Sequence, residues 1–196
     1  MKEKEIVARC VNPFVWIAGV RALLYGGTGL LVSVVLSWFT GFHYHGILHF
    51  GSAPNSAWWC YLAEHLIVWL VPTVLFYGGG LVASHSRFRA VDLFGTMLFA
   101  QIPLIGMNLI YALPPMKVLS CVNPAMSPQE ILNQPGLGLA VVLSLFGLPF
   151  LMAAVVWMFN ALKVSCNLKG GRLWTVALIG IIGGDVVCRM FIRFFY

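Results

Sequence analysis

The chain has 196 residues, of which 60% are hydrophobic and 9% are charged, and its mean hydropathy is +0.90. Soluble domains carry about a quarter charged residues, so these figures exclude a soluble globular fold and indicate an integral membrane protein. The net charge of +6 comes without a basic stripe interleaved with aromatic residues, which argues against nucleic-acid binding.

Residues 1–21 precede the first apolar run and mix charged, aromatic and aliphatic side chains. Between residues 6 and 20 this mixture predicts an interfacial helix on the cytoplasmic face, interrupted near Asn12-Pro13. No small-residue cleavage site of the secretory type follows the first apolar run, so we expect the first span to be retained.

Five segments approach or exceed the roughly 20 apolar residues that are needed to cross a hydrocarbon core of about 30 Å. They run over residues 22–42, 58–83, 90–113, 137–159 and 173–195. Pro72, Pro103 and Pro149 fall near the middle of the second, third and fourth segments and predict kinked helices. Residues 22–196 are therefore expected to form one all-α domain, a five-helix transmembrane bundle.

Small residues recur at helical spacing in two of these segments. Gly29, Ser33 and Ser37 form a stripe on the first, and Gly180 and Gly184 form a GxxxG pair on the fifth. Such residues let helix backbones approach closely, either inside one bundle or between two copies of the chain. We expect the internal use.

The longest connection, residues 114–136, contains Ser127-Pro128-Gln129-Glu130. A serine followed three residues later by glutamate, with proline at the first helical position, is a capping-box pattern. It predicts a short extracytoplasmic helix that stops by Pro135-Gly136.

The basic residues predict the orientation of the chain. If the N-terminus is inside, nine basic residues lie on the cytoplasmic side and three on the outer side. The nine are Lys2, Lys4, Arg9, Arg21, Arg87, Arg89, Lys163, Lys169 and Arg172. The three are Lys117, Arg189 and Arg193. This bias follows the positive-inside rule and predicts a multi-pass inner-membrane protein with a cytoplasmic N-terminus and an extracytoplasmic C-terminus.

Several short motifs resemble those of the Yip1-domain family of five-span membrane proteins, in particular its compact bacterial, Bacteroidetes-type members. They are Asn12-Pro13-Phe14 with Trp16-Ile17 and Arg21-Ala22-Leu23, Val91-Asp92-Leu93-Phe94-Gly95-Thr96 with Pro103, Phe159-Asn160-Ala161, and residues 164–170. The resemblance implies a helical membrane domain and its topology. In eukaryotic members it also implies organisation of vesicle traffic through small GTPases and partner membrane proteins.

Polar residues at membrane depth are the candidates for function, because an unpaired charge there costs a few kcal/mol. Counted along the helices at about 1.5 Å per residue, five of them fall at a similar depth in the outer half; they are Glu64, His65, Asn108, Asp185 and Arg189. Asp185 and Arg189 are four residues apart and are expected to pair, and Glu64 is expected to be a second acceptor for the guanidinium. The cluster is either an outward-facing pocket for an anion, lipid headgroup or proton, or a structural network that fixes helix register, which we favour.

Two further groups have simpler interpretations. His43, His45 and His49 could bind zinc or copper, but their spacing is not a specific metal motif, and we expect no metal site. Asp92, at the start of the third span, is expected to be a helix cap.

The sequence carries no nucleophile elbow, phosphate-binding loop or zinc-protease motif in a credible context, so we expect no enzymatic activity and no cofactor. An intramembrane enzyme acting on lipid through His65 and Glu64 is the weakest alternative, because no nucleophile accompanies that pair. The chain is predicted to be a membrane-organising or interaction module that contacts membrane lipids and a membrane-protein partner or a second copy. The alternative is a small transporter or channel component that uses the outer-half pocket.

Overall fold

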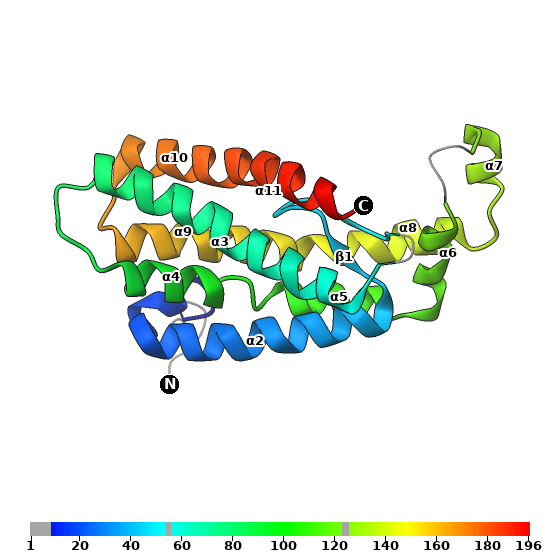
Figure 1. Ribbon diagram of the computed structural model, residues 1–196, viewed down its shortest axis with the longest axis horizontal. Helices are drawn as coiled ribbons and strands as arrows, with labels where there is room; N and C mark the ends of the chain where they lie inside the picture. The colour runs from blue at the N-terminus through cyan, green and yellow to red at the C-terminus, as the bar shows by residue number, and fades with distance from the viewer. Residues whose placement is uncertain (1–8, 54–55, 123–125) are drawn as a thin grey trace.

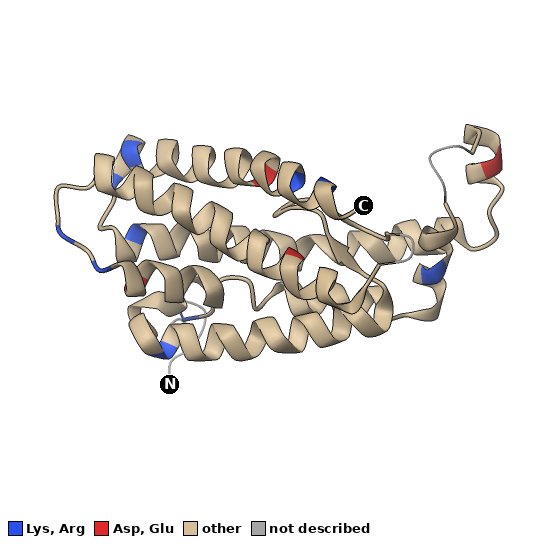
Figure 2. Ribbon diagram, viewed as in Figure 1, with Lys and Arg blue, Asp and Glu red and all other residues tan. Residues whose placement is uncertain are grey.

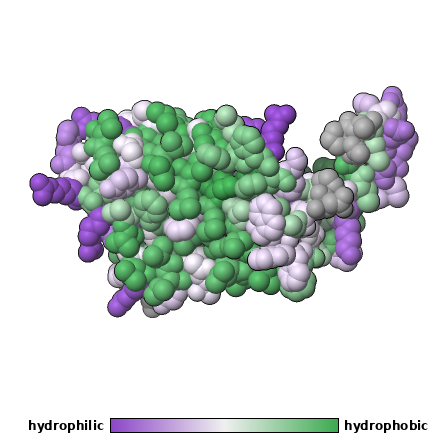
Figure 3. All heavy atoms as spheres, in the orientation of Figure 1, coloured by the Kyte–Doolittle hydropathy of each residue, from purple (hydrophilic) through white to green (hydrophobic). Residues whose placement is uncertain are grey.

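In the computed structural model, which describes residues 9–53, 56–122 and 126–196, the chain is a bundle of long helices (Figure 1). Five of them are long and apolar enough to cross a membrane, as an all-α membrane bundle requires; they are Gly19–Thr40 (α2), Trp58–Ala83 (α3), Ala90–Tyr111, Leu137–Ser165 and Gly170–Phe195. Apolar side chains cover the outside of the spans in Figure 3, with Val82 and Phe194 among the most exposed. This surface suits contact with lipid tails rather than water.

Three spans are divided into shorter elements. The third consists of Ala90–Phe99 (α4) and Leu104–Tyr111 (α5), and the fourth of Leu137–Leu145 (α8) and Leu148–Ser165 (α9). The fifth consists of Gly170–Leu178 (α10), a π-helical turn Ile179–Gly183 (η3), Gly184–Ile192 (α11) and Arg193–Phe195 (η4). The connections hold Pro13–Val15 (η1), His43–Tyr44 (β1), Phe50–Gly51 (β2), Pro114–Lys117 (η2), Val118–Cys121 (α6) and Pro128–Leu132 (α7).

The predicted bounds are close to the observed ones, and the second span agrees with its prediction at both ends. The first helix begins three residues early, at Gly19, and ends at Thr40, because Gly41 adopts the left-handed conformation with φ +69°. The fourth span continues to Ser165 instead of ending at Phe159, since Ala161 and Leu162 are fully buried in the bundle.

The prolines have different consequences in the three spans. Pro72 lies inside the continuous helix α3, where it removes the hydrogen bond to the carbonyl of Val68. The Gln101 side chain, from the turn between α4 and α5 in the third span, donates to that carbonyl at 3.1 Å and satisfies it. Pro103 and Pro149 instead stand at the starts of α5 and α9, where the third and fourth spans are interrupted.

The small residues are used inside the bundle, as expected. A Cβ atom at Gly180 would lie 2.2 Å from the Phe76 ring, and one at Gly184 would lie 3.1 Å from Pro72, both on α3. A Cβ atom at Gly29 would lie 2.8 Å from Ile102. These glycines therefore form internal seams, which allow the close approach of α11 to α3 and of α2 to the third span.

The segment before the first span is anchored against the fourth. Trp157 Nε1 donates to the carbonyl of Cys10 at 2.7 Å, and Asn160 Nδ2 donates to that of Val11 at 2.9 Å. The buried Phe14 ring packs edge-on against Phe99 and Trp157. Helical structure is interrupted at Asn12-Pro13, as predicted.

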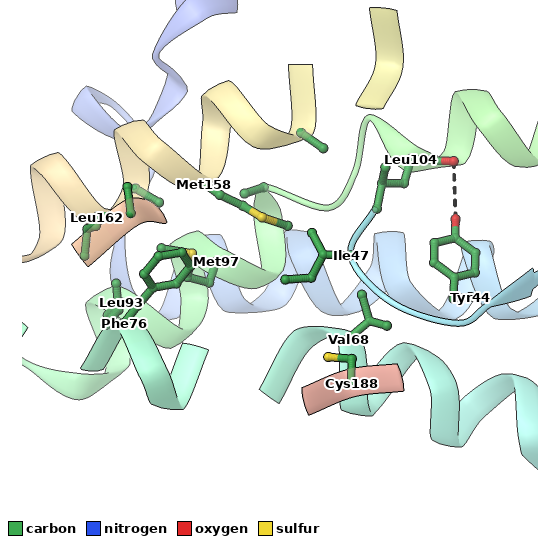
Figure 4. Close-up of a cluster of buried hydrophobic side chains, with 14 of the residues drawn as sticks. Tyr44, Ile47, Val68, Phe76, Leu93, Met97, Leu104, Met158, Leu162 and Cys188 are labelled. Carbon is green, nitrogen blue, oxygen red and sulfur yellow. Dashed lines mark hydrogen bonds between the residues drawn. The ribbon is translucent and has the colours of Figure 1, made fainter. Parts of the chain in front are cut away.

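The loop between the first two spans, residues 41–53, folds back into the bundle. Its two short strands are antiparallel, with His43 opposite Gly51 and Tyr44 opposite Phe50. Tyr44 and Ile47 are both 1% exposed, and Figure 4 shows Ile47 beside Val68 of α3 and the Tyr44 hydroxyl directed at the Leu104 carbonyl. We call the end of the bundle where this loop lies the loop end, and the opposite end the basic end.

The capping box in the long connection is present as predicted. Ser127 Oγ accepts from the Glu130 N–H, and the Glu130 carboxylate accepts from the Ser127 N–H, at the start of α7. In Figure 1 this helix projects beyond the rest of the bundle at the loop end.

Candidate functional site

Glu64 is fully buried at the loop end and is surrounded by donors. Its Oε1 atom lies 2.8 Å from His43 Nδ1, and its Oε2 accepts the backbone N–H of Tyr44 at 2.9 Å. The Tyr196 hydroxyl also donates to Oε1 and lies 2.7 Å from His43 Nδ1. One carboxylate thus ties the second span to the first loop and to the end of the fifth span.

Asp185 makes the second connection between the spans and the loop. Its Oδ1 accepts the N–H of Leu48 at 2.8 Å, and its Oδ2 lies 2.9 Å from His49 Nδ1 and 3.2 Å from Arg189 Nε. A Cβ atom at Gly46 would lie 2.4 Å from Oδ1, so only glycine leaves room for this carboxylate. The predicted pairing of Asp185 with Arg189 is confirmed.

The prediction that Glu64 accepts from Arg189 is wrong. Among the described residues the ion-pair partner of Arg189 is Asp185, and its side chain is 45% exposed, so water can satisfy its other donors. Glu64 instead takes its partners from the first loop. These partners cannot be read from helical spacing, because His43 and Tyr44 belong to a connection that folds into the bundle.

Asn108 and His65 belong to a third buried group. Asn108 Nδ2 donates to Ser33 Oγ at 2.7 Å and to the Tyr44 hydroxyl at 3.1 Å, while its Oδ1 accepts from Ser37 Oγ at 3.1 Å. His65 Nε2 lies 2.9 Å from the same Ser33 Oγ, and its Nδ1 donates to the Tyr61 carbonyl at 2.7 Å. The five predicted residues therefore do not line one open pocket but fall into three groups, all of which contact the first loop.

The three histidines of the loop have different partners. His43 contacts Glu64, and the half-exposed His49 contacts Asp185. In residues 9–53, 56–122 and 126–196, no group of three histidine, cysteine or acidic side chains is arranged to hold a metal ion.

Asp92 is not a helix cap. The residue before α4 is Arg89, and Asp92 lies in the first turn of the helix, where its Oδ2 accepts from Arg89 Nε at 3.1 Å. A carboxylate in a first turn is stabilised by the helix dipole without capping a backbone N–H.

Two hollows share a lining residue at the loop end. The first, of about 370 Å³, carries three basic side chains, and we call it the basic hollow. Its lining is His45, Ser52, Ala53, Arg189, Ile192, Arg193 and Tyr196. The second, of about 540 Å³, lies between the loop and the third and fourth spans. It is mostly apolar, with Phe42, Met107, Met116 and Leu151 in its wall, and we call it the apolar hollow. Ser52 lines both hollows, so the two lie next to each other on either side of this residue.

The Tyr111 hydroxyl is a buried polar group in the wall of the apolar hollow. Tyr111 is 7% exposed, and within the described residues its hydroxyl makes no hydrogen bond of normal geometry, although the Ser52 side chain lies close enough to act as a partner. An unpaired buried hydroxyl costs about 1–3 kcal/mol, which a ligand acceptor in the hollow would recover.

Burial shifts the pKa values of the titratable groups around the basic hollow. Burial, together with the Glu64 carboxylate, raises the pKa of Tyr196, and burial raises the pKa of Tyr44, so both remain hydroxyl groups. Burial lowers the pKa of His45, which favours its neutral form at physiological pH. The positive charge of this hollow at neutral pH therefore comes from Arg189 and Arg193.

Sequence reasoning missed Ser56, Tyr44 and Tyr196. Ser56 Oγ lies 2.8 Å from His43 Nε2, and His43 in turn contacts Glu64, so a serine, a histidine and a carboxylate stand in line. His43 and Ser56 are 13 residues apart in a connection whose course the sequence does not reveal. The alternation of aromatic and aliphatic residues with histidine in Phe42–Phe50 was the available signal that this loop is buried.

No protein-family model, curated protein or solved structure matches the chain.

Proposed function

We propose that the chain is a multi-pass membrane protein that works as a lipid-interaction module, holding one anionic amphiphile at the loop end. The observation that carries this proposal is the junction of the two hollows at Ser52. Arg189 and Arg193 suit a phosphate headgroup, and the apolar hollow suits an acyl chain. The Tyr111 hydroxyl supplies a donor for an ester carbonyl.

The buried charges favour this module over the alternative of a transporter. Glu64 and Asp185 have their carboxylate oxygens engaged by the first loop, which folds into the loop end of the bundle. The void that adjoins Ser33, Tyr44 and His65 is only about 10 Å³. A solute path through this region would require the loop to leave the bundle and break both connections.

The charge distribution supports a cytoplasmic N-terminus in an inner membrane. Figure 2 shows the middle of the spans almost free of charge, with the basic residues near the two ends. Arg9, Arg21, Arg87, Arg89, Lys163, Lys169 and Arg172 belong to the basic end, against Lys117, Arg189 and Arg193 at the loop end. We therefore propose that the basic end is cytoplasmic and that residues 9–15 lie at the cytoplasmic interface. The resemblance to compact Yip1-domain proteins is in keeping with this topology.

Two native cysteines allow the orientation to be measured. Cys10 and Cys121 are both exposed, the first before the first span and the second in the outer connection. In intact cells, a membrane-impermeant maleimide is expected to label Cys121 and to reach Cys10 only after the membrane is opened. The Cys10→Ser and Cys121→Ser variants identify each signal, and labelling of Cys10 alone in intact cells would reverse the topology.

Lipid binding is tested by native mass spectrometry of the protein purified and re-lipidated with phosphatidylglycerol. We expect about one lipid per chain by the site geometry. Tyr111→Phe removes one hydroxyl and should weaken retention about three- to tenfold, the equivalent of one hydrogen bond. Arg193→Gln should weaken it as well and should abolish the preference for phosphatidylglycerol over phosphatidylcholine.

Tyr25→Phe is the matched control, because Tyr25 is 58% exposed on the first span and should leave retention unchanged. Equal lipid retention in wild type, Tyr111→Phe and Arg193→Gln would refute the proposed site.

A further inference from the structure

The serine, histidine and glutamate at the loop end have the connectivity of an acyl-transfer site. His43 Nδ1 lies 2.8 Å from Glu64 Oε1, and His43 Nε2 lies 2.8 Å from Ser56 Oγ. The carboxylate can only accept, so it holds the hydrogen on Nδ1 and leaves the Nε2 lone pair free to take the proton of the serine hydroxyl. The N–H of Tyr44 donates to the second carboxylate oxygen and fixes its orientation.

Anchoring the loop explains only part of this arrangement. The contacts of Glu64 with His43 and Tyr44 attach the loop to the second span without any help from Ser56. The Ala53 carbonyl lies 3.2 Å from Ser56 Oγ and is a second acceptor that competes with His43 Nε2, 2.8 Å away, for the single hydroxyl hydrogen. Unlike the fully buried His43 and Glu64, Ser56 is partly exposed, as a nucleophile must be.

The start of α3 supplies a place for negative charge next to this serine. Ser56 stands directly before Ala57, the residue that precedes the helix, and no side chain in the described part of the chain caps the first turn. The Cys60 N–H of this turn already donates to the Ala57 carbonyl at 3.0 Å, so among the described residues the N–H groups of Trp58 and Trp59 are the ones that can favour an anion. Such groups beside a nucleophile stabilise the oxyanion that forms when an ester carbonyl is attacked.

The position of the group suits a lipid substrate. Trp58 is 68% exposed at the start of α3, as is typical of a side chain at a membrane interface. The basic hollow borders the group on two sides, through Ala53, whose carbonyl is near Ser56 Oγ, and through Tyr196, which contacts His43 and Glu64. A lipid held by its headgroup there brings ester bonds close to Ser56.

We propose that Ser56 and His43 are catalytic residues and Glu64 a positioning residue of a site that hydrolyses the carboxylic ester of a membrane amphiphile. The identity of the substrate rests on the proposed function, whereas the assignment of Ser56 as the nucleophile does not. It departs from the sequence-based expectation that the chain is not an enzyme, because the folded loop supplies the base that Ser56 lacks in the linear sequence.

The reaction balances with water as the only co-reactant. Ser56 Oγ forms a bond to the carbonyl carbon while its proton passes to His43 Nε2, and the π electrons move to the carbonyl oxygen. When that pair returns, the bond to the alkoxy oxygen breaks, and His43 gives its proton to the leaving group, which departs as the alcohol. Water then attacks the acyl-serine, gives one proton to His43, and releases the carboxylic acid as Ser56 Oγ recovers the proton.

The nucleophile is tested with an alkyl fluorophosphonate, from which a reactive serine displaces fluoride. In full-length protein reconstituted in phosphatidylglycerol vesicles, the adduct is expected on the peptide that contains Ser56, and Ser56→Ala should reduce labelling to background. Ser120→Ala is the matched control, since Ser120 is exposed and, among the described residues, its hydroxyl donates to the Lys117 carbonyl within its own turn. No adduct on Ser56 of the folded protein would overturn the proposal.

The substrate is tested in the same vesicles by mass spectrometry of released fatty acid. Ester-linked phosphatidylglycerol should release fatty acid with wild type, and the ether-linked lipid should release none. Release should fall roughly 10³-fold or more in Ser56→Ala, because the nucleophile is lost. Equal release by wild type and Ser56→Ala would contradict the inference.

Two readouts separate this inference from the proposed function and from a structural role of Glu64. Ser56→Ala should retain phosphatidylglycerol as wild type does, so lipid retention without labelling would refute only the catalytic site. Glu64→Gln preserves the shape of the side chain and an acceptor for the Tyr44 N–H. This variant should slow labelling of Ser56 roughly tenfold or more while lipid retention stays unchanged. A parallel loss of retention and labelling would instead assign Glu64 a structural role.

Discussion

Replacement of Glu64 by alanine is expected to lower the free energy of unfolding by about 3–5 kcal/mol, because each buried donor left without its acceptor costs about 1–3 kcal/mol. Glu64 is fully buried and accepts from His43, the Tyr44 N–H and Tyr196. Without the carboxylate the buried His43 Nδ1 and Tyr44 N–H lose their acceptor, and the first loop loses its connection to α3.

The measurement is thermal or denaturant unfolding in detergent, followed by the fluorescence of the tryptophans. Glu130→Ala is the comparison, since Glu130 is exposed in the capping box of α7, outside the bundle, and its loss should leave the unfolding of the spans nearly unchanged. Similar unfolding curves for wild type and Glu64→Ala would mean that the carboxylate does not hold the loop.

Replacement of Gly180 by alanine is expected to destabilise the bundle by about 1–3 kcal/mol, because it overpacks a seam that has no free space. The new Cβ atom would lie 2.2 Å from Phe76 Cε1 and 2.4 Å from Cδ1, and the Phe76 ring is itself fully buried. Either the ring must leave its position or the fifth span must move away from α3. Since α11 carries Asp185 and Arg189, movement of the span would also disturb the contact with Leu48.

Gly183→Ala is a closely matched control. Gly183 lies in the same π-helical turn, three residues further on, and a Cβ atom there would meet nothing within 4 Å. We expect Gly183→Ala to unfold like wild type, and equal stability losses for the two variants would show that the effect comes from the backbone of the turn rather than from the contact with Phe76.

The spans could be predicted because apolar runs longer than the membrane core are a property of local sequence. The hydrogen bond lost at Pro72 and the capping box at Ser127 followed from single residues as well. The partner of the carbonyl that Pro72 frees could not be predicted, because Gln101 comes from another span and only the packed bundle brings it to Val68.

The candidate site was predicted in part. Glu64 and Asp185 were singled out correctly as buried charges, since a carboxylate within an apolar run requires a partner, but only the Asp185–Arg189 pair lies within a single helix and could be read from spacing. The partners of Glu64 come from a loop and from the far end of the chain. His43, Ser56 and Tyr196 acquire their roles only when residues 41–53 enter the bundle.

Photo-crosslinking can show whether the two hollows at the loop end hold one amphiphile. Phosphatidylglycerol with a diazirine on its acyl chain would be incorporated with the protein in vesicles and irradiated, and the crosslinked residues would be mapped by mass spectrometry. We expect crosslinks to Met107, Met116 or Leu151 in the apolar hollow, and their reduction in Arg193→Gln. Crosslinks confined to lipid-facing residues such as Val82 and Phe39, unchanged in that variant, would contradict this expectation.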